Sequence, residues 1–327
     1  MVWWIELLWS LLKLVIAFAF IFITALVLIW MLRKVMGHMQ YRRGPLHHGP
    51  HGMWQTVFDA LKLLGKEDII PTGVDRWTFI WAPIVVFIPT LTIFAFIPFA
   101  EKITATNIEI SLFFVLAVMG LSILSLLMAG WGSNNKYALL GGLRGAAQMM
   151  SYEIPMIIST MGVVLMAGSM NLTEIVRAQQ HIWYAVPQIM GFFIFFTASL
   201  AEINSTPFDI PEAESEIVAG FNVEYSGFRF AAFFLAEFVN LFIVCALATL
   251  LFLGGWQPSA NPVWGTVIFL AKTYVLIFIA MWIRSTFPRF RLDQFMDFGW
   301  KVLLPLSLAN LFITAVIVLA VDKIRSV

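Results

Sequence analysis

Apolar runs about as long as one bilayer crossing recur along this chain and constrain its fold more than any other feature. A transmembrane helix needs about 20 mainly apolar residues, and such runs fall near 9–32, 76–98, 110–130, 153–170, 183–202, 231–253, 265–284 and 301–321. Of the 327 residues, 61% are hydrophobic and only 12% are charged, whereas soluble domains carry about 25% charged residues. We therefore predict an all-α integral membrane protein, a single polytopic domain over 1–327 with about eight transmembrane helices.

Prolines interrupt several of these runs, among them Pro83, Pro89, Pro155 and Pro305. Such residues are tolerated at membrane depth where neighbouring helices satisfy the freed backbone groups. We therefore expect a packed bundle of tilted or kinked helices. No internal repeat is visible between the two halves, which disfavours an inverted-repeat transporter.

The first loop contains a short amphipathic segment at 53–66. Apolar residues recur there at helical spacing with charged residues between them: Trp54, Val57, Phe58, Leu61, Leu64 and Asp59, Lys62, Lys66. This pattern predicts an interfacial helix of about 13 residues. It is either an ordinary peripheral helix or the roof of a cavity that opens toward the lipid.

Most lysines and arginines fall in the odd-numbered loops between the predicted spans. Cytoplasmic loops of membrane proteins carry an excess of these residues. We therefore expect the odd loops to be cytoplasmic, with a partner docking there, and both termini to be non-cytoplasmic.

The composition also excludes several kinds of function. A net charge of +1 gives no electrostatic basis for binding nucleic acid. The single cysteine, Cys245, cannot hold an iron–sulfur cluster, which needs about four thiolates. The histidines His38, His47, His48 and His51 lack cysteine or acidic partners at metal-ligand spacing, so we interpret them as solvated loop residues rather than a metal site.

The segment 201–237 concentrates acidic residues between two apolar runs, with Arg229 as its only cation. It holds seven of the nineteen acids: Glu202, Asp209, Glu212, Glu214, Glu216, Glu224 and Glu237. Carboxylates beside hydrocarbon are costly, and an ionisable residue at membrane depth is a functional-site hypothesis by default.

A structural explanation covers part of this cluster. Pro211 suits the first turn of a helix, where acids gain about 0.3–1 kcal/mol from the helix dipole. That would account for acids after Pro211 without a function. It does not account for Glu202 and Glu237, which lie inside or at the ends of apolar runs.

Five segments together carry a family resemblance. They are RKVMGHMQYRRGP (33–45), GPHGMWQTVFDALKLLGKE (49–67), GWGSNNKYALLGGLRGAAQMMSYEIP (130–155), AEINSTPFDIPEAESEIVAGFNVEYSGFRFAAFFLAEF (201–238) and WIRSTFPRFRLDQFMDFGWKVLLPL (282–306). In this order they resemble the H subunit family of NADH-quinone oxidoreductase, respiratory complex I, which includes the first NADH-dehydrogenase subunit of mitochondria. The most specific motif is PFDxPEAExE followed by GFNVEYSG.

The resemblance implies a quinone-binding and coupling subunit that links quinone reduction to proton translocation. It implies a quinone cavity or entrance formed by Arg33, Gln40, Arg42, Phe58, Asp59, Lys62, Glu67, Arg284, Arg289 and Arg291. It implies proton or coupling roles for Glu153, Glu202, Asp209, Glu212, Glu214, Glu216, Glu224, Tyr225 and Glu237.

The resemblance also implies the surroundings of such a subunit. The chain would be a non-redox part of a proton-translocating enzyme in a bacterial inner membrane, with quinone as substrate and no cofactor of its own. Iron–sulfur clusters would lie on partner subunits. Those partners would include soluble quinone-site subunits on the cytoplasmic side, small membrane subunits and antiporter-like pumping subunits.

One position departs from the family pattern. The family usually has Glu directly before the Arg-Lys pair at the end of the first span, and this chain has Leu32 there. Two other functions also fit parts of the sequence. One is the homologous membrane subunit of a multisubunit nickel–iron hydrogenase, and the other is a stand-alone proton-coupled transporter.

Overall fold

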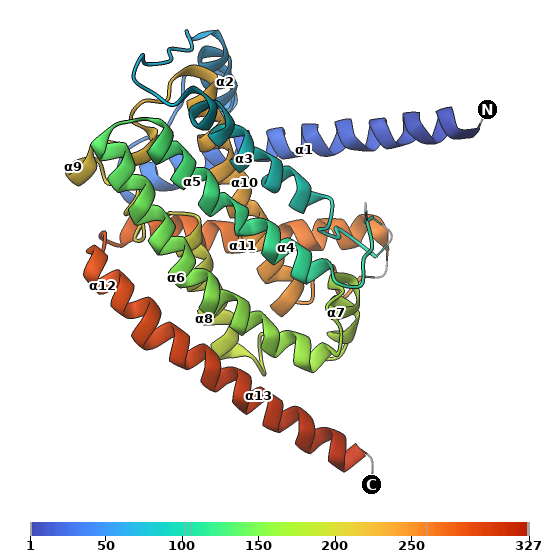
Figure 1. Ribbon diagram of the computed structural model, residues 1–327. Helices are drawn as coiled ribbons and strands as arrows, with labels where there is room; N and C mark the ends of the chain where they lie inside the picture. Colours follow the sequence, from blue (N-terminus) through green and yellow to red (C-terminus); the bar gives the residue numbers. More distant parts are fainter. Residues whose placement is uncertain (1, 102, 105, 260, 326–327) are drawn as a thin grey trace.

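The computed structural model describes residues 2–101, 103–104, 106–259 and 261–325, without the side chains of 2–14, 214–215, 322 and 324–325. Regular secondary structure in these residues is helical (Figure 1). The longest helices are α1 (Val2–Met39), α3 (Arg76–Phe94), α6 (Lys136–Ala167), α10 (Gly227–Phe252), α11 (Pro262–Thr286) and α13 (Leu304–Arg325). The shorter ones are α2 (Trp54–Gly65), α4 (Ser111–Met119), α5 (Leu121–Gly132), α7 (Leu172–Ala178), α8 (Ile189–Glu202), α9 (Glu214–Ile217) and α12 (Leu292–Asp297). Single turns η1 (Pro50–Gly52), η2 (Gly220–Asn222) and η3 (Phe298–Leu303) complete the order.

Seven helical segments in the described part of the chain are long and apolar enough to cross a membrane. They are Val15–Met39, Arg76–Phe94, Ser111–Gly132, Lys136–Ala167, Gly227–Phe252, Pro262–Thr286 and Leu292–Val321. The predicted fold class, an all-helical integral membrane bundle, is confirmed. One further apolar helix, α8, has 14 residues. It therefore measures about 21 Å, which is less than the bilayer core of about 30 Å. Its crossing stays a prediction.

Helix α6 begins much earlier than the sequence pattern indicates. The glycines before residue 153 are typical of a loop, but the helix starts at Lys136 and includes Arg144. These glycines allow α6 to approach α5. A Cβ atom added at Gly130 would lie 2.7 Å from the carbonyl oxygen of Ala138, and one at Gly142 would lie 2.9 Å from that of Leu126. Small residues at such crossings are typical of membrane helices.

Helices α6 and α10 form the centre of the bundle. Helix α6 packs against α5, α8 and α13, while α10 packs against α3 and α11 (Figure 1). About two thirds of the α10 span is buried, so a polar residue on α10 is enclosed by protein on most sides. This arrangement places the second half of the acid-rich segment inside the bundle.

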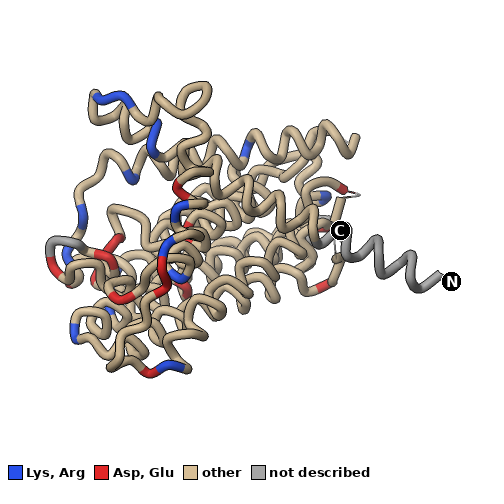
Figure 2. Tube along the Cα trace, turned by 90° about the horizontal axis from the view of Figure 1, so that it is seen from above, with Lys and Arg blue, Asp and Glu red and all other residues tan. Residues whose placement is uncertain are grey.

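The charged residues are distributed unevenly over the molecule. Figure 2 shows Lys, Arg, Asp and Glu gathered mainly toward one side, while the rest of the bundle is nearly free of them. The segment between α8 and α10 holds Asp209 and Glu216, and the segment between α11 and α12 holds Arg289 and Arg291. The bundle therefore has one polar end where functional side chains collect.

The close contact of α5 with α6 gives a test of the fold. We expect Gly142→Leu to lower the free energy of unfolding by about 1–3 kcal/mol, the usual cost of overpacking. The matched control is Gly65→Leu, because a Cβ at Gly65 meets nothing within 4 Å. Chemical unfolding in detergent, followed by helical circular dichroism, measures both. Equal losses in the two variants would contradict the packing described for the α5–α6 crossing.

Candidate functional site

An apolar cavity of about 570 Å³ lies between α1, α2, α3 and α10. Most of its wall is aliphatic or aromatic, with side chains such as Phe87 and Phe228. Its polar edge consists of Arg33, Asp59 and Lys62. Both the volume and this mixture of a large apolar wall with a few polar groups are typical of small-molecule sites.

Helix α2 contributes a mixed set of side chains to this cavity: Thr56, Asp59, Ala60, Lys62, Leu63 and Leu64. A guanidinium nitrogen of Arg33 donates a hydrogen bond to a carboxylate oxygen of Asp59, which joins the end of α1 to α2. The ammonium group of Lys34 donates to the carbonyl oxygen of Pro45, 2.7 Å away, and holds the intervening loop. The chain thus fixes the polar edge of the cavity with groups from α1 and the first loop.

Leu32 is buried in the hydrophobic core at 9% exposure. The carboxylate partner of the neighbouring Arg33 comes instead from Asp59, 26 residues away. The sequence showed no acid near Arg33, because this partner is brought close only by the packing of α2 against α1.

Four other residues predicted for the cavity or its entrance do not line it. Arg42 donates to the side-chain oxygen of Gln40 at 2.8 Å, and both side chains are exposed. Phe58 is 49% exposed and contacts the ring of His48. The carbonyl oxygen of Glu67 accepts from the hydroxyl of Ser226. These residues lie in the first loop and α2, but away from the cavity wall.

Two arginines after the middle of α11 pair with acids of the acid-rich segment. Arg284 donates to Glu237 of α10 at 2.7 Å, and Arg289 donates to Asp209 at 2.9 Å. The third predicted arginine, Arg291, is exposed and pairs with Asp293 two residues away. The first two pairs therefore connect the end of α11 and the loop after it to the acids, and the third does not.

Glu212 is the most perturbed acid of the loop. Burial raises the pKa of its carboxyl group to about 8, and the nearby negative charges of Glu237 and Asp209 add to this effect. The side-chain amide of Asn222 donates to Glu212 at 2.7 Å. The proton affinity of Glu212 therefore depends on its charged neighbours as well as on its burial.

Two effects shift the pKa of the Asp209 carboxyl group in opposite directions. Burial of its carboxyl group raises its pKa, and the guanidinium of Arg289 partly opposes the shift. One carboxylate oxygen, Oδ1, is buried without a hydrogen-bond partner among the described residues. Asp209 is therefore a buried carboxylate whose charge is only partly compensated by its arginine.

The helix-dipole explanation does not apply to Glu212. Helix α9 begins at Glu214 and has only four residues, so Glu212 precedes it. Glu216 lies in this helix, is exposed and accepts a hydrogen bond of 2.6 Å from Arg144. The side chain of Glu214 lies outside the described part of the structure.

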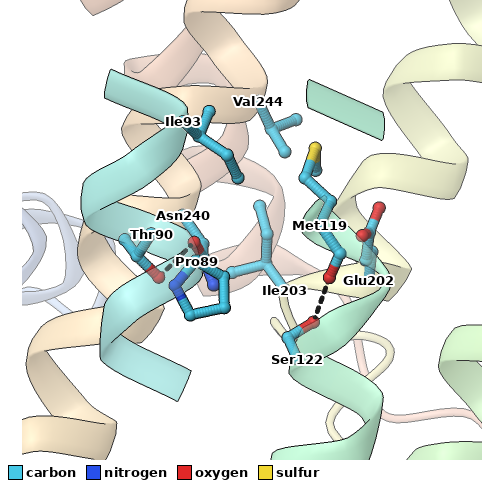
Figure 3. A pocket seen from close by; sticks show the side chains of 9 residues that line it. All are labelled: Pro89, Thr90, Ile93, Met119, Ser122, Glu202, Ile203, Asn240 and Val244. Carbon is cyan, nitrogen blue, oxygen red and sulfur yellow. Dashed lines mark hydrogen bonds between the residues drawn. The ribbon is translucent and has the colours of Figure 1, made fainter. Parts of the chain in front are cut away.

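Two small cavities lie beside Glu202, and one of them also reaches Glu212 of the loop. The first, of about 50 Å³, is lined by Glu202, Glu212 and Glu237. The second, of about 20 Å³, shares Glu202, Ser122, Ile203 and Asn240 with it (Figure 3). A cavity needs about 10–15 Å³ to hold a water molecule. Each is large enough for water beside a carboxylate.

Glu202 ends α8 and is almost completely buried, at 7% exposure. Its Oε2 atom has no hydrogen-bond partner among the described residues. Thr90 donates to the side-chain oxygen of Asn240 at 3.2 Å in the adjoining wall (Figure 3). A polar lining next to an unpartnered carboxylate oxygen can accommodate bridging water.

Glu153 of α6 continues this series of acids. Its charge lies close enough to that of Glu202 for an electrostatic interaction. A Cβ atom added at Gly120 would lie 2.7 Å from Oε1 of Glu153. The glycine between α4 and α5 therefore makes room for this carboxyl group.

Glu224 and Tyr225 lie at the edge of the acid series. The side-chain amide of Asn135 donates to Glu224 at 2.7 Å. The ring of Tyr225 stacks on Phe79, with centroids 4.2 Å apart, and contacts Phe233, which lines the 50 Å³ cavity. Burial raises the pKa of the Tyr225 hydroxyl, which donates to the backbone oxygen of Phe79.

Several neutral partners of the acids were not evident from the sequence. Asn222, Asn135 and Asn240 contact or surround them, and Asn240 had a visible signal as an amide inside an apolar run. Asp68 also pairs with Arg229, at 3.0 Å. In the described part of the chain, no group of three or more His, Cys, Asp or Glu side chains could hold a metal ion.

Comparison with known proteins gives a consistent result. The model of the NADH dehydrogenase family matches residues 12–315. The chain is 54% identical to the NADH-quinone oxidoreductase H subunit of Geobacillus kaustophilus over 87% of this chain and 86% of that protein. The chain is 49% identical to the H subunit of Brevibacillus brevis, over 96% of this chain and 95% of that protein. It is 47% identical to the H subunit of Dehalococcoides mccartyi, over 99% of this chain and 90% of that protein.

The raised pKa of Glu212 predicts a measurable titration. The ordinary value is 4.5 and the folded value is about 8, so the folded protein retains a proton that the unfolded chain releases. Stability should therefore fall as the pH rises from 4.5 to about 8. We expect infrared absorption of a protonated carboxyl group to disappear as the pH passes about 8.

Glu212→Gln should remove this titration, while Glu174→Gln, which changes an exposed acid of α7, should leave it intact. An unchanged infrared titration in Glu212→Gln would assign the proton to another carboxyl group.

Proposed function

The chain belongs to the NADH dehydrogenase family as a membrane subunit of NADH-quinone oxidoreductase, and from this premise we propose how it serves quinone reduction and proton translocation. The observation that carries the proposal is the 570 Å³ apolar cavity with Arg33, Asp59 and Lys62 at its polar edge. A quinone has a long apolar tail and a compact polar headgroup. The tail would lie against the apolar wall, and the headgroup would pass the polar edge on its way inward.

The arginines would guide the headgroup. A guanidinium group stays charged at every physiological pH and donates several hydrogen bonds in a fixed geometry. Arg33, Arg284 and Arg289 each hold a carboxylate, so their positions are fixed before a quinone arrives. Gln40, Arg42, Phe58, Glu67 and Arg291 would act at the outer entrance or at contacts with partner subunits.

The acids would couple quinone reduction to proton movement. Two-electron reduction of a quinone takes up two protons, so the cavity needs proton donors nearby. Carboxyl groups with pKa values near neutral are suited to this transfer, and Glu212, at about 8, is in that range. A change of charge at the quinone would alter the proton occupancy of Glu212 and Asp209, which influence each other electrostatically.

From there the change would pass inward along the small cavities. Glu202 lines both cavities, and Glu153 interacts electrostatically with it. The protons would continue toward antiporter-like pumping subunits beside the bundle. Glu224 and Tyr225 would link the loop to the polar end of the bundle, with Glu214 and Glu216 on the outer side of the same loop.

The partners and orientation follow from the distribution of charge. The soluble quinone-site subunits, which carry iron–sulfur clusters, would dock on the charged end of the bundle (Figure 2). That end would face the cytoplasm of a bacterial cell, with both termini on the opposite side of the inner membrane. Small membrane subunits would cover part of the lateral surface.

The two other functions suggested by parts of the sequence have less support. The relatives at 47–54% identity are named as H subunits of NADH-quinone oxidoreductase. A hydrogenase membrane subunit would not need the 570 Å³ cavity, because it binds no quinone. A stand-alone transporter would not need the other subunits of the complex.

The acid series gives one test in the assembled complex. We expect Asp209→Asn to lower quinone-dependent turnover by about 10²-fold or more, the usual contribution of a proton-transferring group. Glu202→Gln should lower proton translocation, and turnover with it, because Glu202 lines both water-sized cavities, one of them together with Glu212 and Glu237. Asp297→Asn, an exposed acid paired with Lys301, is the control. Normal quinone reduction and normal pumping in both site variants would contradict these roles.

The cavity gives a second test. Leu63 lines it, so Leu63→Trp should obstruct a long isoprenoid tail. Overpacking costs about 1–3 kcal/mol, which should raise the KM for a long-tailed quinone by about 5- to 150-fold. The effect on a short-tailed quinone should be smaller. The control is Leu61→Trp on the same helix, because Leu61 is 57% exposed and away from the cavity. The same KM in both variants would place the entrance elsewhere.

A further inference from the structure

A second apolar cavity, of about 450 Å³, lies between α8, the end of α11 and α12. Its wall includes Leu200, Phe208, Phe290 and Phe295, with Tyr152 of α6 behind them. It shares no lining residue with the 570 Å³ cavity and is built from different helices. The proposed quinone path therefore leaves it unused.

The polar groups in this wall are satisfied within the protein. The hydroxyl of Tyr152 donates to the backbone oxygen of Phe295 at 2.8 Å, and that of Thr197 donates to the backbone oxygen of Phe193 at 2.7 Å. Gln294 is exposed at the rim. A molecule inside would find almost no hydrogen-bonding partner, so a quinone headgroup does not fit it, whereas a plain hydrocarbon chain does.

The cavity opens outward beside membrane-spanning helices. Three of its lining rings, Phe287, Phe290 and Phe298, are 37–54% exposed. Ile283 belongs to the α11 span and Phe295 to the last span. Apolar cavities do not hold ordered water, and empty space beside aromatic rings loses their dispersion contacts. The hydrocarbon available to fill this space in a bilayer is a lipid chain.

Two cations lie close in sequence to lining residues: Arg291 directly follows Phe290, and Lys301 comes three residues after Phe298. Arg291 precedes α12 and Lys301 follows it, and their side chains are 74% and 71% exposed. The partners that they contact among the described residues, Asp293 and Asp297, are exposed as well. Such surface pairs are weak, so either cation can turn toward a phosphate group.

We propose that this cavity binds an acyl chain of a membrane phospholipid, with Arg291 and Lys301 at its phosphate. The bound chain packs behind the contact between Phe208 and Phe290, whose ring centroids are 5.8 Å apart. The backbone N–H of Phe290 donates to the carbonyl oxygen of Pro207 at 3.2 Å. The adjoining residues form the Arg289–Asp209 ion pair. The lipid thereby supports the contact between two loops, the one between α8 and α9 that holds Asp209 and the one between α11 and α12 that holds Arg289.

Photolabelling of the assembled complex tests the proposal. The complex is reconstituted into vesicles of phosphatidylcholine and phosphatidylglycerol that contain a phospholipid with a diazirine in the middle of one acyl chain. After illumination, we expect label on peptides covering 283–298. Thr197→Trp and Leu200→Phe, which fill the cavity, should reduce the label to the level found on the exposed face of α13. Leu308→Trp on that face, 50% exposed, should leave it unchanged.

Three results would overturn the lipid assignment: no label on 283–298, undiminished label in both filling variants, or cross-linking of 283–298 to another subunit. Loss of the label to excess long-tailed quinone would identify a quinone site instead. Lys301→Gln should weaken labelling, and equal labelling would overturn the phosphate contact. These readouts do not depend on turnover, so they stand apart from the quinone tests.

Discussion

The burial of carboxyl groups with too few cations is the constraint on which the rest of this structure depends. Only two of the central loop and helix acids, Asp209 and Glu237, have arginine partners, and both arginines come from the end of α11 or just after it. Glu212 and Glu202 have none among the described ion pairs. A buried, uncompensated carboxyl group such as that of Glu212 retains its proton more strongly than in water. In the proposed function, the same shortage of positive charge that would destabilise an ordinary bundle would raise the proton affinity of these groups toward the range needed for proton transfer.

The helices around the acids are shaped to admit them. Glycines allow α5 and α6 to cross closely, and Gly120 makes room for Glu153. Amides from Asn222 and Asn135 hold individual carboxylates, while Asn240 and Thr90 line the adjoining cavity. The result is a polar interior only a few water molecules wide, enclosed by an apolar bundle. Its narrowness favours proton movement along defined groups over free access of solvent.

Two large apolar cavities lie beside this interior and differ in their polar edges. The cavity at α1 and α2 has an ion pair and a lysine at its edge, which suits a substrate with a polar headgroup. The cavity at α8 and α12 has satisfied hydroxyls inside and cations only outside, which suits a hydrocarbon chain. Phe208 lines the second cavity, and Asp209 is the next residue in the chain. The proposed lipid would therefore pack against the same loop that holds Asp209.

The sequence by itself determined the class of fold, the positions of most apolar helices, the amphipathic helix α2 and the acid-rich segment, because length and hydropathy act locally along the chain. It also carried the family resemblance that the comparisons confirmed. It did not determine the start of α6, since glycines weaken isolated helices yet suit close membrane crossings. Nor did it determine that Asp59 pairs with Arg33 or that Arg284 pairs with Glu237. Those relations join groups far apart in the chain, and only packing in three dimensions decides which charges meet and which stay buried alone.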